Sequence, residues 1–154
     1  MNMADISLPA LAERIAERFR IQTQRHSIVV DFPQEFPVIL ADENRLTQVL
    51  SNLVSNAIKY APGGEVRISG QVHRKQVVIC VSDNGPGIDP ADIPYVFDVF
   101  YRSDKAVRKT KGAGLGLYLA KSIVEAHGGR MWVDPQPSTG ARICFSLPRP
   151  LTRY

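Results

Sequence analysis

Two asparagines and a lysine lie along one edge of a predicted helix. Asn52, Asn56 and Lys59 occupy positions i, i+4 and i+7 of the helical pattern from Asp42 to Tyr60, so their side chains project from one side. Asparagine is unfavourable inside a helix because its amide competes for backbone hydrogen bonds. An amide oxygen suits Mg²⁺, which shares phosphate oxygens, and a lysine one turn further can meet those phosphates. This edge predicts a metal and phosphate site, and a solvated polar face remains the alternative.

A glycine loop follows an apolar strand pattern later in the chain. Ser82–Pro90 reads SDNGPGIDP and comes directly after the run Val77–Val81. An ionised Asp83 only accepts hydrogen bonds, so it can accept from the exocyclic amine of adenine, whereas the O6 acceptor of guanine would repel it. Gly85 and Gly87 would let the backbone lie against a flat base without a Cβ. A plain strand-to-helix turn is the alternative, because these residues are also common in turns.

A second glycine-rich segment precedes an apolar helix pattern. Lys111–Leu117 reads KGAGLGL and follows a basic stretch, Tyr101–Lys111, which holds five basic residues against one acid. Free N–H groups at a helix start attract anions, and the neighbouring cations strengthen that attraction. Neither the dinucleotide fingerprint G-x-G-x-x-G nor the P-loop pattern is present. A flexible hinge with a solvated charge run is the alternative.

Composition and periodicity bound the fold that must position these residues. The chain has 154 residues, of which 44% are hydrophobic and 22% charged, as in a single soluble domain. It has neither an apolar run long enough to span a membrane nor a signal-peptide core. Helices and antiparallel hairpins predict a two-layer α/β sandwich, a mixed and largely antiparallel sheet with helices on one face. The expected helices are a segment capped by Ser7, Asp42–Tyr60, a short stretch near Ala91–Phe100, and a segment from Leu115 to Gly128. The expected strands are His26–Phe32, Phe36–Leu40, Glu65–Val72, Val77–Val81, Met131–Val133 and Ala141–Leu147.

The chain has two cysteines, Cys80 and Cys144, each inside an apolar strand pattern. They form no C-x-x-C pair and lie far from any histidine cluster. We predict buried free thiols in a reducing cytosol rather than a disulfide or a metal site.

Four segments together resemble a known family. NLVSNAIKYAPGG, DNGPGI, FDVFYRSD and GAGLGLYLAKSIVEAHGG are similar to the N, G1, F and G2 boxes of the catalytic ATP-binding domain of sensor histidine kinases, in the superfamily of gyrase, chaperone, histidine-kinase and mismatch-repair ATPases. The resemblance covers roughly Leu8–Leu147. It implies a Bergerat-type ATP-binding fold over a single domain, residues 1–154 with a core at about 8–148, and a lid at about 101–114.

The resemblance also implies roles for the residues of each box. Asn56 would hold Mg²⁺ between the phosphates of ATP with the assistance of Asn52, and Lys59 would contact phosphate. Tyr60 would pack beside the adenine, and Asp83 would bind its N6 amine. Gly85, Gly87 and Ile88 would shape the base pocket. Phe97 and Phe100 would anchor the lid, and Arg102 would reach the γ-phosphate. The segment that closes the lid would present N–H groups to the phosphates through Lys111, Gly112, Gly114, Leu115, Gly116 and Leu117. Val99 stands where the F box often has proline, which leaves the stiffness of the lid hinge open.

The resemblance further separates a kinase from a hydrolase. Relatives that hydrolyse ATP carry a glutamate, which activates water, at the position of Asn52, and an amide is no general base. The expected acceptor is a histidine, yet His26 lies in a strand pattern, His73 in a turn and His127 at a helix end. We therefore expect the acceptor on a separate dimerisation and phosphotransfer domain, with a response regulator downstream.

Other readings remain open at this point. A serine kinase of the anti-sigma type would share the nucleotide boxes, and a non-catalytic ATP-binding module would act by docking. Nucleic-acid binding is disfavoured because aromatic residues do not interleave the basic loop. We expect a cytoplasmic domain, free or as the cytosolic part of a membrane-bound sensor, without membrane contact and monomeric when isolated.

Overall fold

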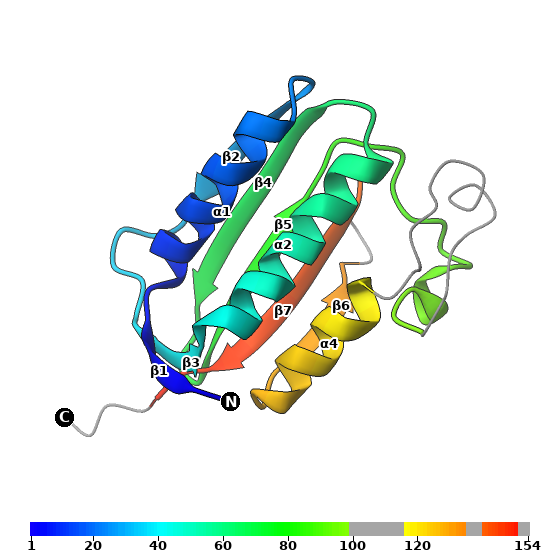
Figure 1. Ribbon diagram of the computed structural model, residues 1–154. Helices are drawn as coiled ribbons and strands as arrows, with labels where there is room; N and C mark the ends of the chain where they lie inside the picture. The colour runs from blue at the N-terminus through cyan, green and yellow to red at the C-terminus, as the bar shows by residue number, and fades with distance from the viewer. Residues whose placement is uncertain (99–115, 135–139, 151–154) are drawn as a thin grey trace.

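The structure, a computed structural model, describes residues 1–98, 116–134 and 140–150. In these ranges, α1 (Leu8–Gln22), α2 (Glu43–Tyr60) and α4 (Gly116–Ala126) cover one face of a five-stranded sheet (Figure 1). None of the helices in the described ranges has the length and apolarity needed to cross a membrane. The predicted helical layer on one side of the sheet is confirmed.

The main sheet is mixed, as predicted. Its strands are β2 (His26–Asp31), β4 (Gly64–Val72), β5 (Gln76–Ser82), β7 (Arg142–Pro148) and β6 (Arg130–Val133), in this spatial order. β2 and β4 run parallel, and the other neighbours pair antiparallel. A separate two-stranded sheet joins β1 (Met3–Ile6) to β3 (Ile39–Asp42).

The core lies between the helices and the sheet. The strands β5 and β7 are buried along most of their length, and the side chains on their face toward the helices join the core, where an apolar stripe of α2 meets them. The helices and the sheet bury apolar surface against each other there and so remove it from water, and this burial is the main force that holds the two layers together. The buried residues on these three elements are Val77, Ile79, Val81, Ile143, Phe145, Leu147, Leu46, Val49, Leu50, Leu53, Val54 and Ala57.

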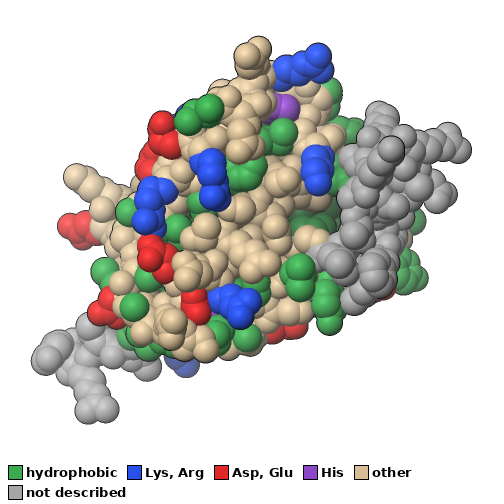
Figure 2. All heavy atoms as spheres, viewed as in Figure 1, with side chains coloured by type: hydrophobic (Ala, Val, Ile, Leu, Met, Phe, Trp, Pro, Cys, Tyr) green, Lys and Arg blue, Asp and Glu red, His purple; other side chains and the backbone are tan. Residues whose placement is uncertain are grey.

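The helix starts follow the predicted capping. The Ser7 hydroxyl accepts from the N–H of Ala10, and the Asp42 carboxylate accepts from the N–H of Arg45 at 3.1 Å. The outer surface of the helical layer mixes basic and acidic side chains (Figure 2). Arg14 pairs with Glu43 across α1 and α2, so this face shows no field of a single sign.

Three elements differ from the sequence prediction by more than one or two residues at an end. β1 was not expected, because its four residues carry no clear pattern and its partner β3 lies over thirty residues away. The strand expected from Phe36 begins at Ile39, because Phe36 instead stacks edge-on against Phe32 with ring centres 5.0 Å apart. The helical stretch expected near Ala91 is, within the described residues, only the 3₁₀ turn η1 (Ile93–Tyr95).

The prediction of two free thiols is wrong. Cys80 on β5 and Cys144 on β7 are register partners and form a disulfide. Because side chains alternate along a strand, both point to the face of the sheet opposite the helices, where Val78 and Trp132 pack beside them. The sequence shows that each cysteine lies in a strand but not that the two strands pair in this register.

Candidate nucleotide-binding site

The polar edge of α2 faces the start of α4. Asn52 and Asn56 are half-buried and Lys59 is exposed, as expected for an edge between the core and solvent. The amide nitrogen of Asn52 donates to the backbone oxygen of Gly116 at 3.2 Å. The structure thus brings the asparagine edge next to the end of the second glycine-rich segment.

A buried histidine fixes the far ends of these two helices. His127 follows α4, and its Nε2 accepts from the N–H of Asp42 at 3.1 Å while its Nδ1 contacts the oxygen of Ile123 at 2.8 Å. The N–H groups of Arg45 and Asn2 in turn hold the pKa of the Asp42 carboxyl below its ordinary value. Asp42 therefore caps α2, and His127 joins that cap to the end of α4. These contacts hold the start of α2 against the end of α4.

Backbone groups of the glycine loop and of the segment before β7 hold Asp83. It follows β5 directly, and its N–H donates to the oxygen of Ala141 at 3.0 Å. Its Oδ1 accepts from the N–H of Gly85 at 2.8 Å and from the N–H of Ala141 at 3.2 Å. Among the described residues, Oδ2 has no hydrogen-bond partner. One carboxylate oxygen thus fixes the side chain, and the other accepts from no group in the described ranges.

The glycine loop packs directly against the end of α2. A Cβ on Gly85 would lie 3.0 Å from the Cα of Ala61 and equally close to the Asp83 carboxylate. Gly87 has a φ of +83°, and its Cβ would lie 3.0 Å from the oxygen of Gly140. The packing of the protein itself therefore requires that these two positions have no side chain, whether or not a ligand is bound. This packing sets Asp83 beside the end of α2, where Lys59 and Tyr60 lie.

The side chain after Asp83 ties the loop to the next strand. Asn84 accepts from the N–H of Glu65 through its Oδ1 at 2.9 Å. The N–H of Gly64 donates to the oxygen of Arg25, so the start of β4 is fixed from both sides. These hydrogen bonds join the glycine loop to the start of β4.

Sequence reasoning missed the turn before β7. Gly140 has a φ of +68°, and a Cβ there would lie 1.9 Å from the backbone oxygen of Asp83. Ala141 then supplies two of the three hydrogen bonds that hold Asp83, and Gly85 supplies the third. The glycine directly before an alternating strand was the available signal, but only the pairing of β5 with β7 shows what it approaches.

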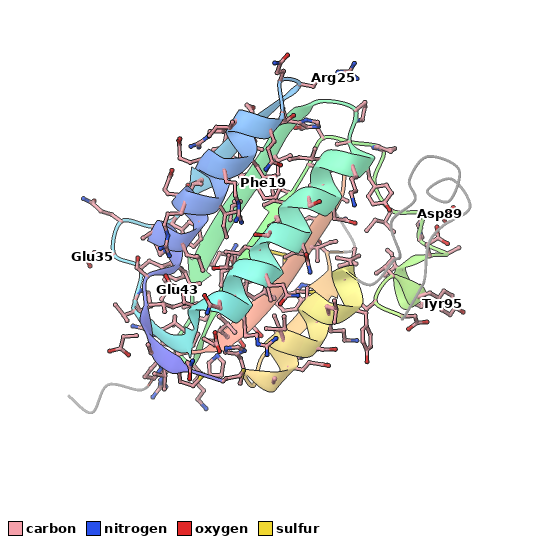
Figure 3. All side chains as sticks on the ribbon, in the orientation of Figure 1. Phe19, Arg25, Glu35, Glu43, Asp89 and Tyr95 are labelled. Atoms are coloured by element: carbon pink, nitrogen blue, oxygen red, sulfur yellow. A yellow bond between two sulfur atoms is a disulfide. The ribbon has the colours of Figure 1, made fainter. Side chains whose placement is uncertain are left out.

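The stretch from Asp89 to Asp98, which directly follows the glycine loop, lies on the same side of the molecule as that loop. Figure 3 shows Asp89 and Tyr95 at the side of the fold to which the loop after β5 leads. Phe97 packs against the core, and the ammonium of Lys121 on α4 lies 5.2 Å from the centre of its ring. Ile88 also packs on the core. Tyr60 is 39% exposed, so its ring is accessible beside the loop.

Several predicted site residues lie outside the described residues. The structure places Gly116 and Leu117 in the first turn of α4. The lid prediction for about 101–114 and the Val99 hinge cannot be compared with it. The same holds for the roles given to Phe100, Arg102, Lys111, Gly112, Gly114 and Leu115.

The polar edge of α2 fits a metal held partly by a ligand. In the described ranges, no group of three or more His, Cys, Asp or Glu residues could hold a metal by itself. Mg²⁺ commonly binds through one or two protein oxygens, with water and substrate phosphates completing its shell. The half-buried amide of Asn56 suits such a shared site.

Together, the one-sided α/β sandwich, the acid at the end of a strand and the glycine-led helix define a nucleotide-binding class of domain. Residues 41–151 match the model of the family described as histidine kinase-, DNA gyrase B-, and HSP90-like ATPases. The chain belongs to this family, which confirms the resemblance drawn from its four sequence boxes.

The relatives are sensor kinases. The chain is 42% identical over 152 residues to the sensor histidine kinase WalK of Bacillus subtilis, covering 96% of this chain and 25% of WalK. It is 41% identical over 134 residues to the adaptive-response sensory kinase SasA of Nostoc sp., covering 85% of this chain and 33% of SasA. The chain thus spans between a quarter and a third of these two curated relatives.

Solved structures agree. The mycobacterial sensor histidine kinase MprB superposes with a TM-score of 0.82 at 29% identity, covering 97% of this chain and 100% of that chain. Full-length ShkA in complex with AMPPNP superposes with a TM-score of 0.85 at 30% identity, covering 99% of this chain and 32% of that chain. The fold and the family are therefore those of the ATP-binding catalytic domain of sensor histidine kinases.

Proposed function

We propose that this chain binds Mg-ATP and transfers the γ-phosphoryl group to a histidine on a separate dimerisation and phosphotransfer domain of a sensor kinase. A response regulator would then receive the group from that histidine. The observation that carries the proposal is the geometry of Asp83, whose Oδ1 is fixed by the N–H groups of Gly85 and Ala141 while Oδ2 faces no described partner.

Asp83 recognises the base in this proposal. Its free oxygen accepts from the N6 amine of adenine, and a guanine in the same position would present an acceptor to an acceptor. Gly87 and Ile88 line the base beside it, and the exposed ring of Tyr60 covers its edge. ShkA, which has the same fold, is known in complex with the ATP analogue AMPPNP, and this supports an adenine nucleotide here.

The edge of α2 and the glycine-rich helix start hold the phosphates. Asn56 supplies an oxygen to Mg²⁺, and Lys59 meets the phosphate charge. When bound, Mg²⁺ would neutralise charge on the phosphates during transfer. Gly116 and Leu117 present N–H groups at the start of α4, where the helix dipole favours anions. We assign the same task to Lys111, Gly112, Gly114 and Leu115, and the approach to the γ-phosphate to Arg102 and the lid that Phe100 anchors.

Asn52 favours transfer to a protein over hydrolysis. Its amide donates to Gly116 and cannot take a proton from water at the pH of the cell. Phosphoryl transfer depends mainly on positioning and on electrostatic stabilisation, so without a base the nucleophile must arrive already positioned. A histidine on a partner domain meets that requirement.

Two of the three histidines of this chain are engaged in hydrogen bonds, and the third lies far from the candidate site. His26 contacts the Thr23 hydroxyl with Nδ1 and the oxygen of Ala61 with Nε2. His127 is 9% exposed and uses both ring nitrogens. His73 lies in the turn between β4 and β5, at the opposite end of β5 from Asp83 and about 20 Å away at the usual strand rise. The acceptor is therefore better supplied by another domain.

The test is phosphotransfer in trans. The chain is mixed with the phosphotransfer domain of its full-length kinase and with ATP labelled in the γ-phosphate. We expect label on that domain that is lost in acid and kept in base, as for phosphohistidine. Acid-stable label would point to the serine-kinase alternative. Nucleotide binding without any transfer would favour the docking module and contradict the kinase proposal.

The remaining proposals concern the context of the domain. We propose that residues 1–154 form one domain that works in the cytoplasm, free or attached to a membrane-bound sensor, and is monomeric when isolated. The close match to the full length of the MprB chain supports a single folding unit.

A further inference from the structure

We propose that the Cys80–Cys144 disulfide is a positioning device for Asp83, and that its reduction by a dithiol weakens adenine-nucleotide binding. The inference rests on the proposed function, because it assumes that Asp83 binds the base. It concerns a part of the molecule that the nucleotide site itself does not use, namely the face of the sheet away from the helices.

The disulfide joins the two strands that hold Asp83. Cys80 and Cys144 are register partners, and the ladder continues through Val81 with Ile143 and Ser82 with Arg142. The next pair is Asp83 and Ala141, which exchange the hydrogen bonds that fix the Asp83 backbone and carboxylate. The covalent link thus lies about 10 Å along the same ladder from the proposed base-binding group.

The turn before β7 makes this sheet edge sensitive to the separation of β5 and β7. The Gly140 turn comes so close to Asp83 that a Cβ would lie 1.9 Å from its backbone oxygen. A small change in the separation of β5 and β7 must therefore move Ala141 relative to Asp83, because the turn has no spare room to absorb it. The orientation of the carboxylate depends on that separation.

The disulfide is enclosed but not deeply covered. Cys80 and Cys144 are each 3% exposed, and Val78 and Trp132 pack beside them. The neighbours of both cysteines along their strands, Ile79 and Phe145, point into the core, so the sulfur atoms lie on the face that α1, α2 and α4 leave uncovered (Figure 1). A reductant therefore has to displace side chains such as Trp132, but not a helix.

Reduction changes the space that the pair requires. A dithiol reductant transfers two electrons and two protons, breaks the S–S bond, leaves one S–H group on each cysteine and becomes a disulfide itself. Two thiol sulfur atoms cannot approach each other as closely as bonded ones. Since the pair is closely packed, the added volume has to separate β5 from β7 or push Trp132 outward. We expect the separation to loosen the Ala141–Asp83 hydrogen bonds.

The first experiment compares the air-oxidised chain with the same chain reduced by dithiothreitol, by calorimetric titration with AMPPNP and Mg²⁺. We expect reduction to lower the affinity about fivefold or more, within the usual range of coupling between sites. Re-oxidation should restore it. Because the chain has two cysteines in all, thiol counting in denaturant should give none before reduction and two after it. Two free thiols in the air-oxidised chain, or equal affinities, would overturn the proposal.

Two variants separate positioning from a general loss of stability. In Asp83→Asn, reduction should change the affinity by less than about twofold. If the disulfide acts through the Asp83 carboxylate, removing that carboxylate also removes most of the effect of reduction. In the double variant Cys80→Ala, Cys144→Ala, dithiothreitol should have no effect. An effect of the same size in either variant would contradict the proposal, since the reductant would then be acting elsewhere.

A spectroscopic readout keeps this test independent of nucleotide binding. Reduction should shift the amide resonances of Gly85 and Ala141, both donors to the Asp83 carboxylate, more than that of His73 at the other end of β5. Unchanged Gly85 and Ala141 resonances would overturn the positioning role. If AMPPNP binds in neither state while these amides shift, the proposed function fails and the link between disulfide and Asp83 stands.

Discussion

At the scale of single residues, the candidate site contains one side chain that accepts hydrogen bonds, Asp83, and one that donates, Asn52. Asp83 uses one oxygen to fix itself on the backbone of Gly85 and Ala141, which leaves the second oxygen pre-oriented. Asn52, by contrast, uses its amide as a donor to Gly116. An acceptor-only group suits a base with an exocyclic amine, and a non-basic amide at the proposed phosphate site suits transfer over hydrolysis.

The Asp83→Asn substitution tests the acceptor. A hydrogen bond to a charged group contributes about 1.5–3 kcal/mol, so affinity for an ATP analogue should fall roughly ten- to a hundredfold. Calorimetric titration measures it. The matched control is Asn84→Asp, which makes a change of the same size on the next residue and keeps the acceptor for the N–H of Glu65. Unchanged affinity in Asp83→Asn would remove the adenine assignment.

Asn56 is the residue on which the metal proposal depends. Removing its oxygen in Asn56→Ala should abolish the difference between nucleotide affinities measured with Mg²⁺ and with a chelator, because Asn56 is the main protein ligand proposed for the ion. Asn56→Asp keeps an oxygen at the same place and should retain the Mg²⁺ dependence. Full Mg²⁺ dependence in Asn56→Ala would show that the metal is held elsewhere.

At the scale of elements, the site depends on how strand ends and helix ends are joined. Periodicity and capping predict α1 and α2 correctly, because Ser7 and Asp42 act locally on the turns that follow them. Pairings between distant segments were not predictable in the same way. β1 with β3, Cys80 with Cys144, and Ala141 with Asp83 all depend on a register that only the assembled sheet fixes.

The Gly140→Ala substitution tests the turn before β7. An alanine in the left-handed region costs about 1–2 kcal/mol, and here its Cβ would also meet the oxygen of Asp83. We expect Gly140→Ala to lower both the melting temperature and the affinity for the ATP analogue. Gly128→Ala is the control, because Gly128 has a φ of +80° but lies after α4, beside Pro148 at the other end of β7. It should lose stability and keep affinity, and a parallel loss of affinity would argue against a specific role of Gly140.

The start of α2 should give the protein a defined sensitivity to acid. The pKa of Asp42 is lowered in the folded chain by the N–H groups of Arg45 and Asn2, so its stabilising effect is present above about pH 4 and lost as the pH falls through the folded pKa. Asp42→Asn keeps an oxygen for the N–H of Arg45 but does not titrate. Melting temperatures measured between neutral and acid pH should fall less steeply for Asp42→Asn than for the natural chain. Parallel curves would contradict this account.

At the scale of the whole molecule, we propose that the chain supplies the nucleotide-binding part of a two-domain phosphotransfer. It resembles one part of the longer kinases WalK and SasA, and two of its three histidines, His26 and His127, are hydrogen-bonded within the fold. The four boxes were recognisable from the sequence because each lies within a short stretch. The contact of Ala141 with Asp83, by contrast, joins residues far apart in the sequence, so it could be recognised only from the pairing of β5 with β7.

The measurement that tests the central claim most directly is calorimetric titration of the chain with AMPPNP and with its guanine counterpart, with and without Mg²⁺. The account predicts binding of the adenine analogue in roughly the micromolar range, strengthened by Mg²⁺, and at least about tenfold weaker binding of the guanine analogue. Equal binding of the two analogues would contradict base recognition by Asp83. Absence of binding under every condition would contradict the nucleotide site as a whole.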